Sequence, residues 1–298
     1  MKQELINIKW DNVPCHICNK QNSQPILLRN KPLVEGQFGY AIHPVICHGC
    51  GLIFLSPRWS KEDYNVFYTH YYDKLYRLET KPDYGTSAVL ANMQEIWSRI
   101  KSHLSVSGKV NILDVGCAYG YGLKYLKEQI PNSMLYGIES SPDGIKIMQT
   151  KEVGAKLISE DFDSNWDNEY ENQMDLIILR HVFEHVLNPI ESLNKLRKAL
   201  KPNGLVYFAV PDMANIRTKL RDYEYWWEYI FRSVHTYYYS KDTFIKTLEL
   251  GGLYPVVLGE EKEEIWCLAS VNKTSPFKFK NNYKMQKMIL ESLLPQDF

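Results

Sequence analysis

Four of the six cysteines in this 298-residue chain fall into two C-x-x-C pairs, a spacing typical of thiolate metal ligands. Cys15 and Cys18 form the first pair, and Cys47 and Cys50 form the second. Each pair can wrap one side of a tetrahedral ion, so the two pairs together close its coordination shell. We therefore expect a structural Zn²⁺ that organises a small N-terminal module. Loss of the ion should loosen the module while the main domain stays folded.

Two alternative interpretations of the cysteines stay open, a redox pair and cysteines without a common role. A redox C-x-x-C is expected beside a βαβ unit, and neither pair follows one. His16, His43 and His48 lie close enough in the sequence to replace a cysteine ligand. With four thiols available, these histidines are expected to be bystanders.

A second group of reactive side chains lies in the segment RHVFEHVLNP, directly after the apolar run Met174–Leu179. If that run is a parallel strand, His181, Glu184 and His185 fall at the carboxyl edge of a sheet, where open α/β folds bind ligands. The pattern H-x-x-E-H is also a zinc-protease signature, but that site requires a long helix. Here an apolar strand precedes the motif and Pro189 follows it, which argues against a protease.

A glycine-rich turn follows the first apolar run of the main domain, in the segment NILDVGCAYGYG. Asp114 leads the turn, and Gly116, Ala118 and Gly120 let the backbone approach a ligand. A dinucleotide turn would read G-x-G-x-x-G and face a pyrophosphate, which an acid would repel. The observed D-x-G-x-A-x-G better suits a positively charged ligand, such as the ammonium and sulfonium groups of S-adenosylmethionine.

Further candidates for the same ligand follow the next strands. Glu139 ends the second predicted strand, which is the usual position for an acid that binds both ribose hydroxyls. The neighbouring Ser140 is also expected to contact the ligand. Asp161 and Phe162 follow the third strand and are expected to hold an adenine by a hydrogen bond and an apolar ring contact. Arg180, at the end of the fourth strand, is included in the same site.

Alternating apolar runs and helices must position these residues. Continuous apolar runs suit strands that are buried on both faces of a mainly parallel sheet. We expect an α/β fold with a seven-stranded, doubly wound, Rossmann-like sheet. The predicted strands are Val110–Val115, Met134–Ile138, Ala155–Ile158, Met174–Leu179, Leu205–Val210, Leu253–Leu258 and Ile265–Val271, and the helices between them are Tyr121–Gln129, Pro142–Lys151, Pro189–Leu200 and Lys241–Leu250.

The composition changes along the chain and predicts four segments. Apolar residues at helical spacing also predict helices over 58–77 and 86–104. The segments are 1–57, a zinc-binding module; 58–107, a helical connector or lid; 108–272, the main domain with an aromatic insertion at 223–239; and 273–298, a C-terminal helical tail.

The overall charge excludes some classes of function. Thirty-five Lys and Arg balance thirty-five Asp and Glu, so there is no global field to attract long nucleic acids. No apolar stretch reaches ~18 residues, and the first residues lack the apolar core of a signal peptide. We expect a soluble, cytoplasmic protein without membrane insertion.

Six elements, in order, resemble the class I S-adenosylmethionine-dependent methyltransferases. They are LDVGCAYG, IES, EDF, MDLIILRHVFEHVLNP, LKPNGLVYFAVP and YYYSKDTFIKTLELGGL, and they span residues 109–272. The resemblance implies that S-adenosylmethionine is the methyl donor. One departure is Ala118, where the family usually has glycine, although alanine is small enough to be tolerated.

The segment CHGCGLIFLSPRWSKEDYNVFYTHYY resembles the zinc-binding part of bacterial methyltransferases that modify deoxysugars or cell-surface polysaccharide precursors. In that family a tyrosine-rich helix closes over the donor, which nominates Phe67, Tyr68, Tyr71 and Tyr72. Alternatively, these rings only pack the helix onto the main domain. The sugar C-methyltransferases of the group carry a further C-terminal domain that this chain ends too soon to include. Transfer to oxygen is therefore favoured, with nitrogen or carbon as alternatives.

Methyl transfer to a sugar hydroxyl requires loss of its proton, and a general base typically contributes ~10²–10⁴-fold. By chemistry and by resemblance, Glu184 and His185 are the expected base or the residues that orient it. His181 is expected to line the donor pocket. His235 is expected to face the cleft, where it is either catalytic or hydrogen-bonded to a loop.

Residues 223–239 contain nine aromatic side chains, and aromatic faces stack on sugars and bases. Arg217, Arg221 and Arg232 lie nearby and can bind phosphates bidentately. A nucleotide-sugar acceptor would use both kinds of side chain. Alternatively, the rings form a packed lid or the contact of a homodimer.

The sequence leaves two other functions to consider. An RNA or protein methyltransferase could use the zinc module to recognise a polymer, but residues 1–60 carry only six basic against three acidic residues, too few for a phosphate-binding face. A binding module with an inactive methyltransferase fold is disfavoured because Asp114 and Glu139 are both present. The expected function is methyl transfer from S-adenosylmethionine to a small molecule, a sugar or nucleotide sugar in particular.

Overall fold

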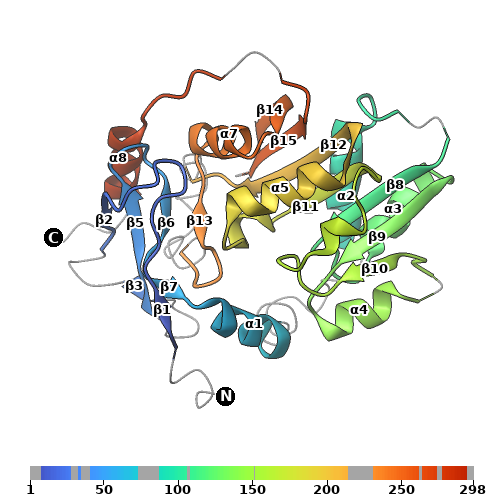
Figure 1. Ribbon diagram of the computed structural model, residues 1–298, viewed down its shortest axis with the longest axis horizontal. Helices are drawn as coiled ribbons and strands as arrows, with labels where there is room; N and C mark the ends of the chain where they lie inside the picture. The colour runs from blue at the N-terminus through green and yellow to red at the C-terminus, as the bar shows by residue number, and fades with distance from the viewer. Residues whose placement is uncertain are drawn as a thin grey trace.

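A seven-stranded mixed sheet forms the core of the main domain in this computed structural model (Figure 1). The structure describes residues 8–27, 33–34, 41–72, 87–105, 108–150, 152–213, 231–261, 264–273 and 277–293. The spatial order is β10-β9-β8-β11-β12-β15-β14. The strands are β8 (Val110–Val115), β9 (Ser133–Ile138), β10 (Lys156–Ser159), β11 (Met174–Arg180), β12 (Leu200–Pro211), β14 (Tyr254–Glu261) and β15 (Glu264–Ser270).

The predicted fold class is confirmed, with one strand of opposite direction. β8 to β12 run parallel, whereas β15 runs antiparallel to both β12 and β14. The chain order reverses at β8, which has β9 on one side and β11 on the other. At such a switch point the loops diverge and leave a crevice at the carboxyl ends of the strands. The glycine turn and the His/Glu segment follow β8 and β11, so they meet at this crevice.

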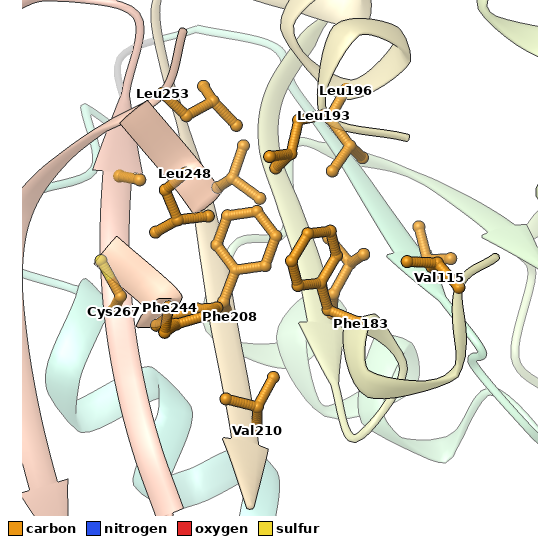
Figure 2. Close-up of a cluster of buried hydrophobic side chains, with 14 of the residues drawn as sticks. Val115, Phe183, Leu193, Leu196, Phe208, Val210, Phe244, Leu248, Leu253 and Cys267 are labelled. Atoms are coloured by element: carbon orange, nitrogen blue, oxygen red, sulfur yellow. The ribbon is translucent and has the colours of Figure 1, made fainter. Parts of the chain in front are cut away.

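Helices cover both faces of the sheet because alternate strand residues face opposite sides. On β11, Leu176 and Ile178 pack with residues of α2 (Ser87–Ile100), α3 (Tyr121–Gln129) and α4 (Pro142–Met148). Ile177 and Leu179 pack with residues of α5 (Pro189–Ala199) and α7 (Lys241–Leu250). Figure 2 shows part of this second cluster between β11, β12 and α7. A fully buried Leu, Ile or Phe there contributes ~1.5–3 kcal/mol.

A four-stranded antiparallel sheet of order β13-β6-β5-β2 forms the N-terminal part. Its strands are β2 (Ser23–Pro25), β5 (Pro44–Cys47), β6 (Ile53–Leu55) and β13 (Tyr237–Tyr238). β13 comes from the far end of the aromatic insertion, so the main domain supplies one strand of this sheet. Two further pairs flank it, β1 (Trp10–Asp11) with β7 (Arg58–Trp59) and β3 (Leu33–Val34) with β4 (Ala41–Ile42).

The C-terminal segment also packs on the N-terminal part. α8 (Tyr283–Leu293) lies beside β5 in Figure 1. Its Ile289 and Leu290 are buried with Ile46 and Ile53 of that sheet. Part of the predicted C-terminal helical tail thus packs against the N-terminal sheet.

The first predicted helix of the connector is shorter than expected. α1 spans Lys61–His70 and begins after Ser60, whose hydroxyl accepts the backbone N–H of Asp63. Arg58 lies in β7 instead, and residues 73–86 lie outside the described part of the chain. Among the described helices, none has the length and apolar character that crossing a membrane would require.

Candidate active site

The glycine turn after β8 holds three residues in the left-handed backbone region. Gly116, Ala118 and Gly120 have φ of 72°, 50° and 74°. The positive φ explains why glycine is usual at the position of Ala118, because alanine there costs ~1–2 kcal/mol. A Cβ on Gly116 would lie 2.7 Å from Cγ2 of Val182, so the turn closely approaches the loop after β11.

Two buried acids stand at the ends of β8 and β9. Glu139 is 4% exposed and accepts the backbone N–H of Ala118 at 2.7 Å and that of Ser141 at 2.9 Å. Asp114 is 8% exposed, and its burial, together with the charge of Glu139, raises its pKa to about 8. Ionisation of Asp114 is therefore unfavourable in this turn, and a positively charged ligand would offset that cost.

The other residues expected around an adenine lie at the end of β10. Asp161 is exposed, and its side chain accepts the backbone N–H of Asp163 at 2.8 Å. Phe162 is half-buried and stacks on Trp166, with ring centroids 6.0 Å apart. Ser140, beside Glu139, is partly exposed. Asp161, Phe162 and Ser140 are thus each at least partly exposed.

A short 3-10 turn, η3 (Phe183–His185), carries the His/Glu segment. Phe183 is fully buried and contacts Phe208 edge-on, with ring centroids 5.3 Å apart (Figure 2). It also stacks on Tyr239, with ring centroids 5.8 Å apart. This anchor fixes the turn and thereby the direction of the neighbouring Glu184. His181, which links β11 to the turn, has φ of 51°, a conformation that non-glycine residues rarely adopt.

Glu184 is the buried centre of the segment, with 1% of its side chain exposed. Its Oε1 lies 3.2 Å from Nδ1 of His181 and 3.7 Å from Nε2 of His185. Its Oε2 is buried and has no hydrogen-bond partner in the described structure. Burial alone would raise the pKa of Glu184, but the hydrogen bond from His181 and the neighbouring imidazoles lower it to about 2. The carboxylate is therefore ionised.

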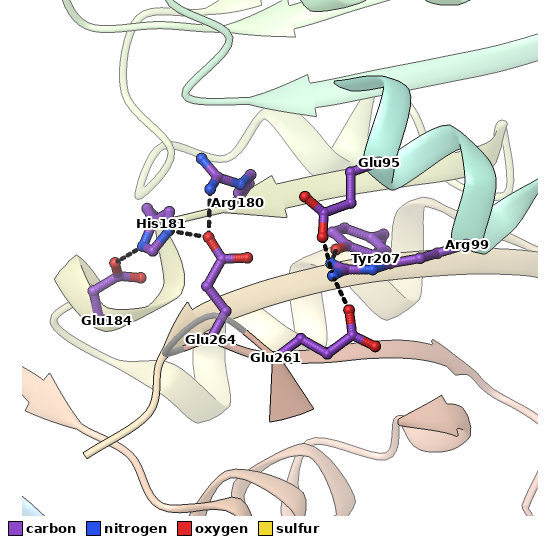
Figure 3. Close-up of polar contacts among 8 residues, drawn as sticks. All are labelled: Glu95, Arg99, Arg180, His181, Glu184, Tyr207, Glu261 and Glu264. Carbon is purple, nitrogen blue, oxygen red and sulfur yellow. Dashed lines mark hydrogen bonds and ion pairs between the residues drawn. The ribbon is translucent and has the colours of Figure 1, made fainter. Parts of the chain in front are cut away.

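Glu264, at the start of β15, was missed by the sequence analysis. Its Oε1 lies 2.7 Å from Nε2 of His181 and accepts a hydrogen bond from Arg180 (Figure 3). Burial lowers the pKa of His181, but its hydrogen bonds to Glu184 and Glu264 outweigh burial and raise the pKa to about 9. His181 is thus an imidazolium held between two carboxylates. No motif marks Glu264, because only the antiparallel pairing of β12 with β15 brings it there.

Tyr68 and His235 complete the cluster from two other elements. The Tyr68 hydroxyl of α1 lies 3.0 Å from Nδ1 of His185. The ring of His235 meets the ring of His185 edge-on, with centroids 5.0 Å apart. Burial lowers the pKa of His185, so this imidazole is neutral. Of the aromatic residues nominated on α1, Phe67 is fully buried, whereas Tyr68 reaches the cluster.

The remaining nominated rings, Tyr71 and Tyr72, lie where α1 ends. Tyr71 is 7% exposed and belongs to the aromatic cluster that packs around Trp59. Tyr72 is half-buried, and its ring lies 5.1 Å from that of Tyr68. Phe67 and Tyr71 thus pack the helix against its surroundings, while Tyr68 and Tyr72 line its partly exposed side.

Arg58 connects the N-terminal part to this cluster, a role that the sequence did not predict. The side chain is 7% exposed and donates to the backbone carbonyl of Leu187 at 2.8 Å and to the Tyr237 hydroxyl at 3.2 Å. The loop between η3 and α5 is therefore fixed by β7.

The four paired cysteines converge at the N-terminal sheet. One sulfur atom from each lies within 4.8 Å of the others, and those of Cys15 and Cys50 are 3.5 Å apart. Around an ion with Zn–S bonds of ~2.3 Å, sulfurs lie ~3.8 Å apart, so the cluster fits tetrahedral zinc. His16 instead lies 2.8 Å from the Thr247 hydroxyl. His43 and His48 face the rings of Trp10 and Tyr283.

The aromatic insertion is only partly described. Five of its rings, and Arg217 and Arg221, lie outside the described residues. The other four, Phe231, Tyr237, Tyr238 and Tyr239, are at most 5% exposed and pack in the cores. These four therefore act as packing residues of the cores. Arg232 is partly exposed.

This chain is similar to known methyltransferases. A family model described as a methyltransferase domain matches residues 81–257. The chain is 26% identical over 152 residues to the ubiquinone biosynthesis O-methyltransferase of Histophilus somni, covering 47% of this chain and 60% of that protein. It is 26% identical over 163 residues to the mitochondrial ubiquinone biosynthesis O-methyltransferase of Dictyostelium discoideum, covering 50% and 49%.

These matches are partial. The chain spans about half to three fifths of the length of these curated relatives. A crystal structure of a protein from Pyrococcus horikoshii OT3 superposes with a TM-score of 0.51 at 16% identity, covering 71% of this chain and 99% of the other. Such a likeness shows a shared fold.

Proposed function

Because this chain belongs to the methyltransferase domain family and is an S-adenosylmethionine-dependent methyltransferase, we propose that it methylates a hydroxyl oxygen of a small molecule. The proposed acceptor class is a sugar or nucleotide sugar, a precursor of capsule or other surface polysaccharide. Two partial relatives are named O-methyltransferases, which supports transfer to oxygen. The resemblance of the N-terminal segment to sugar methyltransferases supports the acceptor class.

The donor would occupy the crevice between the ends of β8, β9 and β10. Glu139 would accept hydrogen bonds from the ribose hydroxyls, and Asp161 and Phe162 would hold the adenine. The backbone of the turn at Gly116, Ala118 and Gly120 would lie against the donor. Asp114 would face positive charge, which its burial beside Glu139 makes favourable.

One observation supports the proposal: a buried, ionised carboxylate with a free oxygen lies next to the glycine turn that would hold the donor. Oε2 of Glu184 has no partner, and β11, which leads to Glu184, is hydrogen-bonded to β8. Strands in a sheet are ~4.8 Å apart, so an acceptor at the cluster would lie beside the donor's methyl group.

The reaction is an in-line displacement in which the acceptor oxygen forms an O–CH₃ bond as the donor's S–CH₃ bond breaks. Holding both reactants in line supplies much of the rate enhancement. A sugar hydroxyl must also lose its proton, and we propose that Glu184 and His185 promote this loss. His181, charged and fixed by Glu264, keeps Glu184 ionised and oriented.

The acceptor class can be tested with S-adenosylmethionine labelled in its methyl group. The purified protein should transfer label to a hydroxyl of a nucleotide sugar, with S-adenosylhomocysteine as the second product. Free sugars, a catechol, bulk RNA and denatured protein serve as competing acceptors in parallel reactions. Transfer to RNA or protein alone would support polymer methylation and contradict this proposal. Transfer to the catechol alone would show that the acceptor class is a phenol and not a sugar.

Donor binding should release a proton near neutral pH. The folded protein holds the pKa of Asp114 at about 8, so the carboxyl is largely protonated at pH 7. A positively charged donor favours the ionised form, and binding should therefore release close to one proton at pH 7 and almost none at pH 9. Affinity should fall as the pH drops below 8. Calorimetry at pH 7 in phosphate and in Tris measures the release through the buffers' different ionisation enthalpies.

Asp114→Asn is the matched control for that measurement. This variant has no carboxyl to titrate, so its binding enthalpy should be the same in both buffers after correction for other groups. Equal enthalpies for the unaltered protein would show that Asp114 does not face the donor's charge.

A further inference from the structure

We propose that Glu184, His185 and His235 bind a divalent cation, which makes this cluster a second metal site distinct from the four cysteines. The inference deepens the proposed function, since the cation would lie where the acceptor hydroxyl has to lose its proton. Two nitrogen ligands and one carboxylate on one side of an ion leave further positions open for an exogenous oxygen.

The ligand atoms are close enough for one ion. One atom from each of the three residues lies within 4.8 Å of the others, and Nε2 of His185 is 3.7 Å from Oε1 of Glu184. Ligands bound at ~2.1 Å lie ~3–4.2 Å apart around an ion. Of the two carboxylate oxygens, Oε2 is buried without a partner in the described structure and is available for a cation.

The surroundings hold the ligands as metal sites require. Metal-binding histidines usually engage their second ring nitrogen in a hydrogen bond that fixes the ring. His185 does this through Nδ1, 3.0 Å from the Tyr68 hydroxyl, which leaves Nε2 toward Glu184. The other carboxylate oxygen of Glu184, Oε1, lies 3.2 Å from Nδ1 of His181, which orients the carboxylate.

The third ligand is fixed to the other two through its neighbour in the chain. The Thr236 hydroxyl lies 3.0 Å from the backbone carbonyl of Glu184 and 2.8 Å from that of Val186. Thr236 is fully buried. The loop that carries His235 is therefore attached directly to η3, although 50 residues separate them in the sequence.

The ligand types indicate the class of ion. Imidazole and carboxylate ligands suit first-row divalent ions such as Mn²⁺, Fe²⁺ and Zn²⁺. Four thiolates instead favour softer metal ions, of which Zn²⁺ is one. Mn²⁺ stands low in the order of affinities, so it should fill the nitrogen and oxygen site without displacing zinc from the cysteines. This difference lets one experiment address the new site alone.

A cation at this position would acidify a hydroxyl bound to it, as a metal ion acidifies bound water. The hydroxyl proton leaves to solvent, and the oxygen keeps its electron pair on the cation. That oxygen then forms the O–CH₃ bond as the S–CH₃ bond breaks, and the sulfonium becomes a neutral thioether. The donor's methyl group and the bound oxygen would face each other across the β8–β11 boundary.

Mn²⁺ binding to the full-length protein tests the site without any acceptor. The protein is first dialysed against citrate, a chelator too weak to strip zinc from four thiolates. Loss of the free-ion Mn²⁺ EPR signal should then show one ion bound per chain. Glu184→Gln and His235→Gln should each weaken binding at least ~10-fold. The exposed His103→Gln serves as the control and should bind like the unaltered protein.

Circular dichroism establishes that each variant is folded, and two variants from different elements guard against a single folding defect. An unchanged free-ion signal with the unaltered protein would overturn the site, and so would Mn²⁺ binding by both ligand variants that equals binding by the unaltered protein. Methyl transfer by a chain that takes up no Mn²⁺ would overturn the cation site alone. Mn²⁺ uptake by a chain that transfers no methyl group would contradict the proposed function and leave the cation site standing.

Discussion

Glu184→Gln and His185→Ala should each lower kcat at least ~100-fold, because the acceptor hydroxyl would no longer be helped to lose its proton. The affinity for S-adenosylmethionine should stay nearly unchanged, since both side chains are proposed to face the acceptor. Glutamine preserves the shape of Glu184 but removes the charge that pairs with His181. Steady-state rates with the acceptor found above, together with donor titrations, measure both effects.

Glu171→Gln is a matched control for the first variant. Glu171 is an exposed carboxylate in the loop before β11, remote from the cluster, and its replacement should leave kcat unchanged. Full turnover by both Glu184→Gln and His185→Ala would mean that positioning alone drives the transfer. In that case the rate would depend on how Tyr68 and the donor site at the end of β8 align the two reactants.

The main sheet could be predicted from the sequence because its signals are local. The run Val110–Val115 is mainly apolar and is followed by glycine and a helix, and β8 has the same bounds. Tyr121–Gln129 and Lys241–Leu250 likewise match α3 and α7 to the residue. In each case the ends are marked by residues that break the pattern, so no tertiary information was needed.

The contacts that complete the site could not be predicted because they depend on how distant segments pair. Glu264 reaches His181 only through the antiparallel register of β12 and β15, which places Glu264 opposite Pro211. Arg58 was assigned to a helix, yet it lies in β7 and holds the loop at Leu187. Neither residue stands in a motif, and each looks like an ordinary surface charge in the sequence.

The N-terminal part differs most from what a single sequence suggests. Its two C-x-x-C pairs indicate a small independent module, but the structure shows a sheet whose fourth strand, β13, belongs to the main domain. Cys15, Cys47 and Cys50 lie in the same apolar cluster as Phe244 and Leu248 of α7. The apolar core around the cysteines is therefore continuous with the core between the main sheet and α7. We expect the two parts to unfold together.

Cys47→Ser should consequently destabilise the whole chain and not only its N-terminal part. Structural zinc contributes ~10–16 kcal/mol to folding in zinc-finger peptides, so losing one of four ligands should cost several kcal/mol. For a chain of this size each kcal/mol lowers Tm by ~2–4 °C, which predicts a fall of ~10 °C or more. Calorimetry should show a single transition at the lower temperature, and elemental analysis should show less than one zinc per chain.

Cys117→Ala is the matched control, because Cys117 is also a buried thiol but contacts the sulfur of Met148 outside the cluster. It should lower Tm by only a few degrees and leave the zinc content unchanged, since the substitution removes one small side-chain atom. Two separate transitions in Cys47→Ser, with the later one at the original Tm, would mean that the N-terminal part unfolds alone. That result would show that β13 and the shared apolar cluster do not couple the metal site to the sheet that carries Glu184.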